Sequence, residues 1–213
     1  MKRLRGADHG VETELGPALG RIYLFSDAVF AIAITLIVLG FDLPHDLALA
    51  EVPGRLAGEL PDFLSFVFGF WILSFFWITH HRMFRHINQM NQGLLVWNMV
   101  VLLCVAFLPF AIVTFGDYPA STTTVILFAA AQAATALACV GMWNFAARTR
   151  LVREDTDPRV FRHVNIRMLV VGIVFLLSIP VALVSRPAAY LMWPLVLIVF
   201  YVVDRRTPAS ARV

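Results

Sequence analysis

Six long apolar stretches, separated by short polar segments, run along most of the chain. They lie near residues 19–41, 62–84, 94–115, 121–146, 164–185 and 187–203. Each has roughly the 17–25 residues that an α-helix needs to cross the hydrocarbon core of a bilayer. The pattern therefore predicts an all-α integral membrane protein with six transmembrane helices and no soluble domain of any size.

The ends of this pattern set the expected domain boundaries. Residues 19–203 form the transmembrane domain, with an N-terminal tail at 1–18 and a C-terminal tail at 204–213. No small-residue cleavage site follows the first apolar stretch, so we expect that stretch to be retained in the mature protein. Proline is favoured in the first turn of a helix, so Pro17 and Pro187 are predicted to begin the first and last helices.

The composition agrees with a membrane protein. Of the 213 residues, 60% are hydrophobic and 15% are charged, and the mean hydropathy is +0.78. Soluble domains are about half apolar and about a quarter charged. Cys104 and Cys139 both lie in apolar stretches, so neither a disulfide framework nor a thiolate metal site is indicated. The net charge of +3 comes without a basic patch interleaved with aromatic residues, so nucleic acid binding is not indicated.

The basic residues are distributed unevenly between the two sides of the predicted bundle. Six spans place both termini on one side, and that side carries 15 of the 17 Lys and Arg residues, leaving only Arg55 and Arg186 on the other. Short loops rich in Lys and Arg stay in the cytoplasm. Both termini are therefore predicted to be cytoplasmic.

Asp27 is a carboxylate inside the first apolar stretch. One interpretation is that Ser26 and Asp27 cap a helix that starts there, but the remaining residues 28–41 would barely span a bilayer. If the helix starts at Pro17, Asp27 lies roughly 15 Å along it. An ionisable group at that depth needs a buried partner. We therefore favour a buried polar network over a simple cap.

Candidate partners for Ser26 and Asp27 lie near the same end of the second and third stretches. Their indole, imidazole and carboxamide groups can all donate hydrogen bonds: Trp77, His80, His81, His86 and Asn98. His81 and His86 with Asp27 could also supply three metal ligands. Adjacent His80 and His81 point about 100° apart on a helix, and no facing helix offers a histidine at this depth, so we expect no metal site.

The middle of the first stretch carries an apolar stripe at i, i+4 and i+7, formed by Ile32, Leu36 and Leu39. Thr35 lies beside it, and small residues that permit close helix approach flank it: Ala28, Ala31 and Ala33. In a symmetric oligomer with this helix at its axis, the stripe would form stacked rings around a narrow constriction. Val29 and Ile37 are then expected to face lipid.

The string R-x-x-x-F-S-D at Arg21, Phe25, Ser26 and Asp27, followed by AVFAIAITLIVL, resembles the transmembrane protein 175 family of potassium channels in its prokaryotic six-helix form. The similarity extends to W-x-x-H-x-R-x-F from Trp77 to Phe84, to Asn98 and to AFLPF at 106–110. It covers roughly the first 115 residues well, whereas the later helices agree mainly in hydropathy.

The resemblance implies a homotetramer in a bacterial inner membrane, with the first helix of each subunit lining a central pore for K+ and no cofactor. It assigns the tightest ring to Ile32, a hydroxyl-bearing pore position to Thr35, and further apolar layers to Leu36 and Leu39. The family's structural hydrogen-bond network would comprise Arg21, Phe25, Ser26, Asp27, Trp77, His80 and Asn98. The adjacent His81 leaves open which imidazole pairs with Asp27.

The function implied is a cation channel, not an enzyme, that prefers K+ modestly over Na+ through a hydrophobic constriction and has no carbonyl filter loop. The alternative is a membrane redox protein that binds haem or quinone through the histidines at the end of the second helix. A proton-coupled transporter is a third class, but the broken helices or inverted repeats typical of such proteins are not visible.

Overall fold

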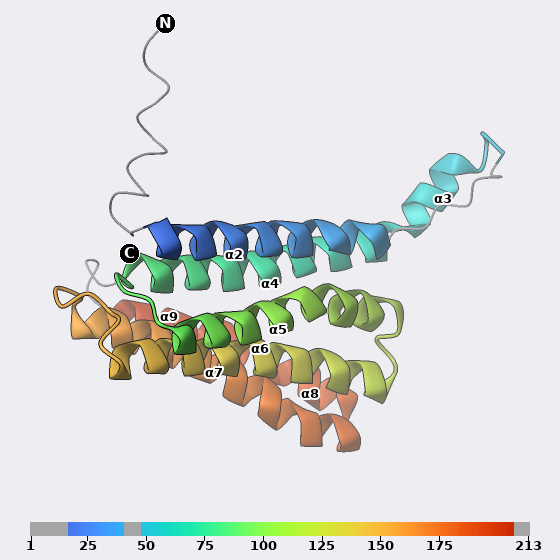
Figure 1. Ribbon diagram of the computed structural model, residues 1–213. Helices are drawn as coiled ribbons and strands as arrows, with labels where there is room; N and C mark the ends of the chain where they lie inside the picture. Colours follow the sequence, from blue (N-terminus) through green and yellow to red (C-terminus); the bar gives the residue numbers. More distant parts are fainter. Residues whose placement is uncertain (1–16, 41–47, 207–213) are drawn as a thin grey trace, which may run out of the picture.

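The computed structural model describes residues 17–40 and 48–206, and this part of the chain forms a bundle of long helices that run side by side (Figure 1). The elements, in chain order, are α2 (Pro17–Leu36), the 3-10 helix η1 (Ile37–Gly40), α3 (Val52–Gly58), α4 (Leu60–Arg85), α5 (Gln92–Asp117), α6 (Thr122–Arg148), α7 (Pro158–Val184), α8 (Arg186–Met192) and α9 (Leu195–Arg206). The expected tails lie outside the described residues, apart from 17–18 and 204–206, which belong to α2 and α9.

The six predicted spans are confirmed as helices that are long and apolar enough to cross a membrane. They are Leu19–Gly40, Leu60–Arg85, Gln92–Asp117, Thr122–Arg148, Pro158–Val184 and Arg186–Val203. The first begins at Pro17 and the last has Pro187 in its first turn, both as expected. The last span is divided in the structure into two helices, α8 and α9. Proline cannot donate a backbone hydrogen bond and crowds the preceding turn, and Pro194 lies at the break between α8 and α9.

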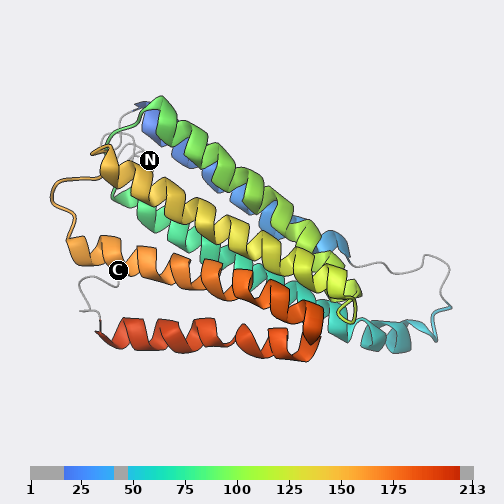
Figure 2. The same ribbon diagram turned by 90° about the horizontal axis from the view of Figure 1, so that it is seen from below.

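The helices are arranged in layers. Figure 1 shows α2 and α4 along one side of the bundle and α5 beneath them, with α6 to α9 on the far side. Seen from below, α8 and α9 run along the edge of the bundle next to α7 (Figure 2). The start of α2 and the end of α9 lie at the same end of the bundle, as an even number of spans requires. The short helix α3 projects beyond the opposite end.

Helix α6 occupies the centre of the fold. Its most apolar window is 61% buried, against 17–39% for the other five spans. Small residues allow this central position because they let neighbouring helices approach closely. A Cβ atom on Gly141 would lie 2.4 Å from the Trp97 ring, and one on Gly93 would lie 2.3 Å from the Phe145 ring. These two glycines therefore set how closely α5 and α6 pack.

Candidate functional site

One face of α2, which continues into η1, is left uncovered by the other described residues. Its buried side chains recur at i, i+4, i+7 and i+11 and pack toward α4 and α5: Ser26, Phe30, Ala33 and Ile37. The uncovered face carries Arg21, Leu24, Phe25, Ala28, Ala31, Ile32, Thr35, Leu36 and Leu39. Ile32 is 59% exposed, Leu36 42% and Leu39 74%. All four residues assigned to a pore from the sequence therefore share one face.

Val29 and Ile37 do not lie where the sequence analysis placed them. Val29 is half-buried against the core, and Ile37 is only 3% exposed. The side chain of Ile37 fits against Gly69 of α4, where an added Cβ would lie 3.0 Å from its Cδ1 atom. Ile37 shares the buried face because it lies eleven residues, or about three turns, beyond Ser26. The expectation that Ile37 faces lipid is wrong.

A chain of hydrogen bonds joins α2, α5 and α4 through three fully buried side chains. Asn98 Nδ2 donates to Ser26 Oγ at 3.0 Å, and the Ser26 hydroxyl donates to the carbonyl of Ile22 at 2.8 Å. His80 Nε2 lies 2.8 Å from Asn98 Oδ1. A carboxamide oxygen can only accept, so the His80 Nε2 atom must carry the proton. The chain therefore runs in one direction, from imidazole to carboxamide to hydroxyl to backbone carbonyl.

Asp27 has a separate partner. Trp77 Nε1 of α4 donates to Asp27 Oδ1 at 2.9 Å. Neither imidazole that the sequence offered fills this role: His80 turns toward α5, and the His81 ring is hydrogen-bonded to the hydroxyl of Tyr23. Trp77 and His81 lie four residues apart and so share the face of α4 that meets α2. Two adjacent residues of α2, Ser26 and Asp27, are thus held from two different helices.

The interpretation of Ser26 and Asp27 as a helix cap is excluded. Both residues lie inside α2, which begins at Pro17. The Ser26 hydroxyl bonds to the carbonyl four residues before it, which is the usual behaviour of serine in a helix interior.

Two of the residues expected in the network are not brought to it. The side chains of Arg21 and Phe25 lie on the uncovered face of α2. Each lies seven residues, or about two helical turns, before another residue of that face: Ala28 and Ile32. Among the described residues, no hydrogen bond or ion pair joins Arg21 to the cluster. Conversely, the sequence analysis missed Tyr23. Tyr23 lies four residues before Asp27, and that spacing could have placed it on the same face.

The histidines do not assemble a metal-binding group. Among residues 17–40 and 48–206, no three His, Cys, Asp or Glu side chains come close enough to hold an ion. The His80 ring instead packs between two aromatic rings, with centroids 5.3 Å from Phe30 and 4.5 Å from Phe84. Aromatic packing and a hydrogen bond to Asn98 therefore account for its position. The haem or quinone alternative gains no support from this geometry.

Comparisons with known proteins identify relatives of this chain. Residues 21–109 match the family model described as endosomal/lysosomal potassium channel TMEM175. A potassium channel of Streptomyces collinus is 30% identical over 177 residues, which cover 79% of this chain and 84% of that protein. A potassium channel of Chamaesiphon minutus is 32% identical over 145 residues, covering 65% of this chain and 71% of the relative.

Solved structures extend the similarity to the whole bundle. The crystal structure of a lysosomal potassium-selective channel TMEM175 homolog from Chamaesiphon minutus has a TM-score of 0.70 at 25% identity, covering 90% of this chain and 99% of that one. A second crystal structure, of a variant of the potassium channel MtTMEM175 in complex with a nanobody fusion protein, has a TM-score of 0.66 at 18% identity, covering 87% of this chain and 91% of that one. This second likeness concerns the fold alone.

Proposed function

The chain belongs to the TMEM175 family of potassium channels, and on this basis we propose that it forms a homotetramer in which four copies of α2 line a central pore for K+. The observation that carries the proposal is the uncovered face of α2. It runs the length of the helix and includes Ile32, Thr35, Leu36 and Leu39, whereas the opposite face is buried against α4 and α5.

The composition of this face favours contact with other subunits over contact with lipid. Small residues at Ala28 and Ala31 would let neighbouring copies of α2 approach closely near the axis. The Thr35 hydroxyl donates to the Ile32 carbonyl at 2.9 Å, so it is satisfied within the helix while its oxygen can still accept a further hydrogen bond. Arg21 would lie at the entrance of the pore, where water can solvate it.

In the proposed pore, selectivity arises from a hydrophobic constriction. Ile32 and Leu36 lie one turn apart, about 6 Å along the axis, and Leu39 adds a further ring. A cation that passes such rings must shed part of its hydration shell, and narrow apolar rings also disfavour water. K+ holds its water less tightly than Na+, so the free energy needed to remove that water is smaller for K+. This mechanism gives a modest preference for K+ without a carbonyl filter.

The polar side chains behind α2 would keep the apolar face turned toward the axis. Ser26 and Asp27 are about 100° apart around the helix, and Asn98 and Trp77 hold them from α5 and α4. Rotation of α2 in either direction would break one of these contacts. Their role in the proposal is therefore structural, and they do not touch the permeating ion.

The proposed location is a bacterial inner membrane with both chain ends in the cytoplasm, including the tails 1–18 and 204–213. The start of α2 and the end of α9 lie at the same end of the bundle, which supports this orientation (Figure 1). In the topology expected from the sequence, 15 of the 17 basic residues belong to this side, as is typical of the cytoplasmic side.

The test is a flux assay on protein reconstituted in liposomes, comparing K+ with Na+ in the parent and in Ile32→Asn. Four amides would replace four apolar groups, so we expect flux to rise and the K+/Na+ ratio to move toward one. Leu177→Asn is the matched control, because Leu177 is 54% exposed on α7, far from the proposed axis. Equal permeability ratios in all three proteins would show that α2 does not line the pore.

A further inference from the structure

The loops that connect α4 to α5 and α6 to α7 are joined at the arginine-rich end of the bundle. The backbone N–H of Arg153 donates to the His86 carbonyl at 2.8 Å, and that of Asn88 donates to the Leu151 carbonyl at 3.0 Å. Between these bonds, Ile87 and Val152 form an antiparallel bridge, and the side chain of Ile87 is fully buried. The two loops, which we call the paired loops (86–91 and 149–157), therefore form one unit.

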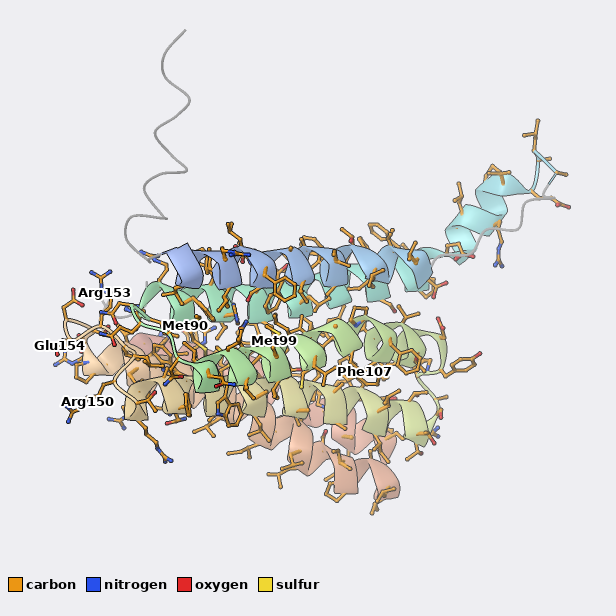
Figure 3. All side chains as sticks on the ribbon, viewed as in Figure 1. Met90, Met99, Phe107, Arg150, Arg153 and Glu154 are labelled. Carbon is orange, nitrogen blue, oxygen red and sulfur yellow. The ribbon has the colours of Figure 1, made fainter. Side chains whose placement is uncertain are left out.

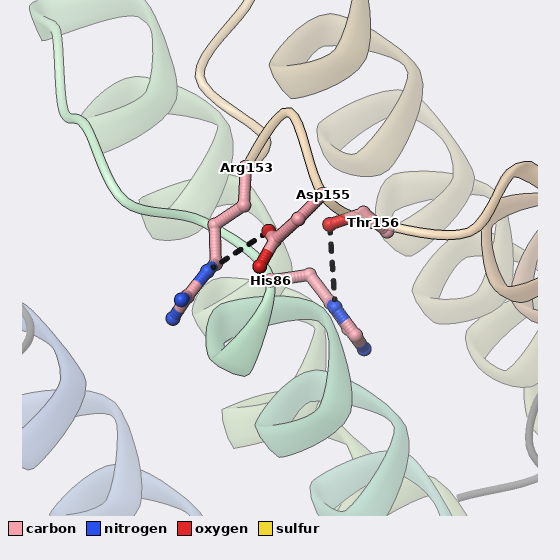
Figure 4. Close-up of polar contacts among 4 residues, drawn as sticks. All are labelled: His86, Arg153, Asp155 and Thr156. Carbon is pink, nitrogen blue, oxygen red and sulfur yellow. Dashed lines mark hydrogen bonds and ion pairs between the residues drawn. The ribbon is translucent and has the colours of Figure 1, made fainter.

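Side chains reinforce the paired loops. Thr156 Oγ1 lies 3.4 Å from His86 Nδ1, and Arg153 Nε donates to Asp155 Oδ1 at 3.3 Å (Figure 4). Only Nε contacts Asp155, and the terminal nitrogens of the Arg153 guanidinium point away from Asp155 in this view. No hydrogen bond from those nitrogens occurs within the described part of the chain. They are available to a ligand.

The paired loops border an open surface cavity of about 540 Å3, which is within the usual size range of small-molecule sites. It is lined by Asn88, Gln89, Arg150, Val152, Arg153, Glu154 and Asp155. Figure 3 shows Arg150, Arg153 and Glu154 gathered at this end of the bundle. The cavity lies just beyond the ends of two membrane-capable helices, α4 at Arg85 and α6 at Arg148.

Arg150 occupies a position that normally takes glycine. Its φ is 57°, which is left-handed. The N–H groups of Arg150 and Leu151 bond back to the carbonyls of Ala147 and Ala146 at 3.2 and 2.9 Å, the pattern of a Schellman motif at the end of α6. A residue with a side chain is strained there, and such strain tends to persist where the side chain has a use. The Arg150 side chain lines the cavity.

We propose that this cavity binds a zwitterionic phosphate ester of the phosphoethanolamine type. The lining carries two guanidinium groups, two carboxylates and two carboxamides, so its net charge is zero and a simple anion would be repelled by the acids that lie beside the arginines. Guanidinium groups match phosphate oxygens with paired hydrogen bonds. Glu154 would accept from the ammonium group, and the amides of Asn88 and Gln89 would donate to the remaining phosphate oxygens. The source is either a phospholipid headgroup or a soluble ester.

The test is thermal unfolding of the full-length protein in a detergent that contains no phosphate. It uses three probes: soluble glycerophosphoethanolamine, phosphatidylethanolamine and phosphatidylglycerol, which has a phosphate but no ammonium group. The first two are phosphodiesters with no net charge at neutral pH. A ligand that binds only the folded state raises Tm. We expect phosphatidylethanolamine, glycerophosphoethanolamine or both to raise the Tm of the parent, and phosphatidylglycerol to have a smaller effect.

Two variants remove the proposed contacts, and one serves as a control. Arg150→Gly deletes a guanidinium while relieving the left-handed strain, so this variant is expected to fold at least as well as the parent. Arg153→Gln removes the other guanidinium. Each should weaken the apparent Kd about tenfold or more, as expected for the loss of a charge-assisted hydrogen-bonded pair. Arg159→Gln, an exposed position on α7 outside the cavity, should leave the Kd unchanged.

A response to the soluble ester assigns the site to a free metabolite, and a response to the lipid alone assigns it to a headgroup; both support the proposal. It is overturned if the parent, Arg150→Gly and Arg153→Gln respond equally, or if phosphatidylglycerol acts as strongly as phosphatidylethanolamine. Absence of any response to the two ethanolamine probes also overturns it.

Discussion

Replacing Asn98 with leucine tests the hydrogen-bond chain that joins three helices. Leucine has a similar size and shape but neither donates nor accepts. The change removes the bond to Ser26 Oγ at 3.0 Å and the bond from His80 Nε2 at 2.8 Å. Ser26 keeps its own bond to the Ile22 carbonyl. The main loss therefore falls on His80, which is fully buried and whose Nδ1 already lacks a partner among the described residues.

The expected cost is the free energy of leaving a buried donor unpaired, about 1–3 kcal/mol. Hydrogen bonds between membrane helices average only about 0.6 kcal/mol in double-mutant cycles, because the unfolded chain finds other partners in the membrane. Full burial of all three side chains places this site above that average. Changing His80→Phe together with Asn98→Leu removes donor and acceptor at once, so the double variant should lose less than the sum by about 1 kcal/mol.

The assay is the free energy of unfolding in mixed detergent micelles for the parent, the two single variants and the double variant. The fraction of the proposed tetramer is measured in parallel by size-exclusion chromatography. Asn98→Leu should lower both the free energy of unfolding and the fraction of the proposed tetramer. The reasoning fails if the free energy of unfolding of Asn98→Leu lies within about 0.3 kcal/mol of the parent's. It also fails if the loss in the double variant equals the sum of the two single losses within about 0.3–0.5 kcal/mol, as it does for independent sites.

Four further substitutions test three other features of the structure by the same unfolding assay. Trp77→Phe and Asp27→Asn should show coupled losses, because the indole donates to this carboxylate at 2.9 Å; additive losses would contradict the contact. Gly69→Ala should destabilise by about 1–3 kcal/mol, since the new Cβ would lie 2.7 Å from Ile112 Cγ2, and a neutral result would mean that the neighbouring helices can move apart. Burial, aided by nearby guanidinium groups, lowers the pKa of His86 from 6.5, so the folded state favours neutral His86 and loses stability as pH falls below 6.5. His86→Gln should flatten that dependence, and an unchanged pH profile would exclude His86 as its source.

The number and approximate positions of the membrane helices can be read from the sequence, because bilayer thickness fixes how long an apolar stretch must be. Their limits are less certain: α7 begins at Pro158, six residues before the expected start. The direction each helix faces is harder to predict. In a helix that is apolar all round, hydrophobicity does not distinguish core from lipid, and for this reason the expectation for Ile37 is wrong. A buried polar residue shows which face of the helix is buried. Counting from Ser26 by i+4, i+7 and i+11 then assigns Phe30, Ala33 and Ile37 to the core.

The sequence supplies most members of the polar cluster, though not Tyr23, and it does not supply their pairing. Ser26, Asp27, Trp77, His80 and Asn98 are all candidates from the sequence, yet the imidazole is expected on Asp27 and the structure has the indole there. Pairing depends on how α4 is rotated relative to α2 and α5. A change of one residue turns a side chain by about 100°, and nothing in a single sequence specifies that angle.

Helix α2 is held by two kinds of contact, on either side of the position of Ile32. Toward its start, Ser26 and Asp27 are fixed by hydrogen bonds from α5 and α4; toward its end, Ile37 of η1 fits against Gly69 of α4. Ile32 lies between these anchors, on the opposite face, and takes no part in either. Orientation of α2 and the chemistry of its uncovered face therefore depend on different side chains. If the uncovered face lines the pore, substitutions at Ile32, Leu36 or Leu39 should alter permeation while the subunit remains folded, and substitutions at the anchors should weaken the fold first.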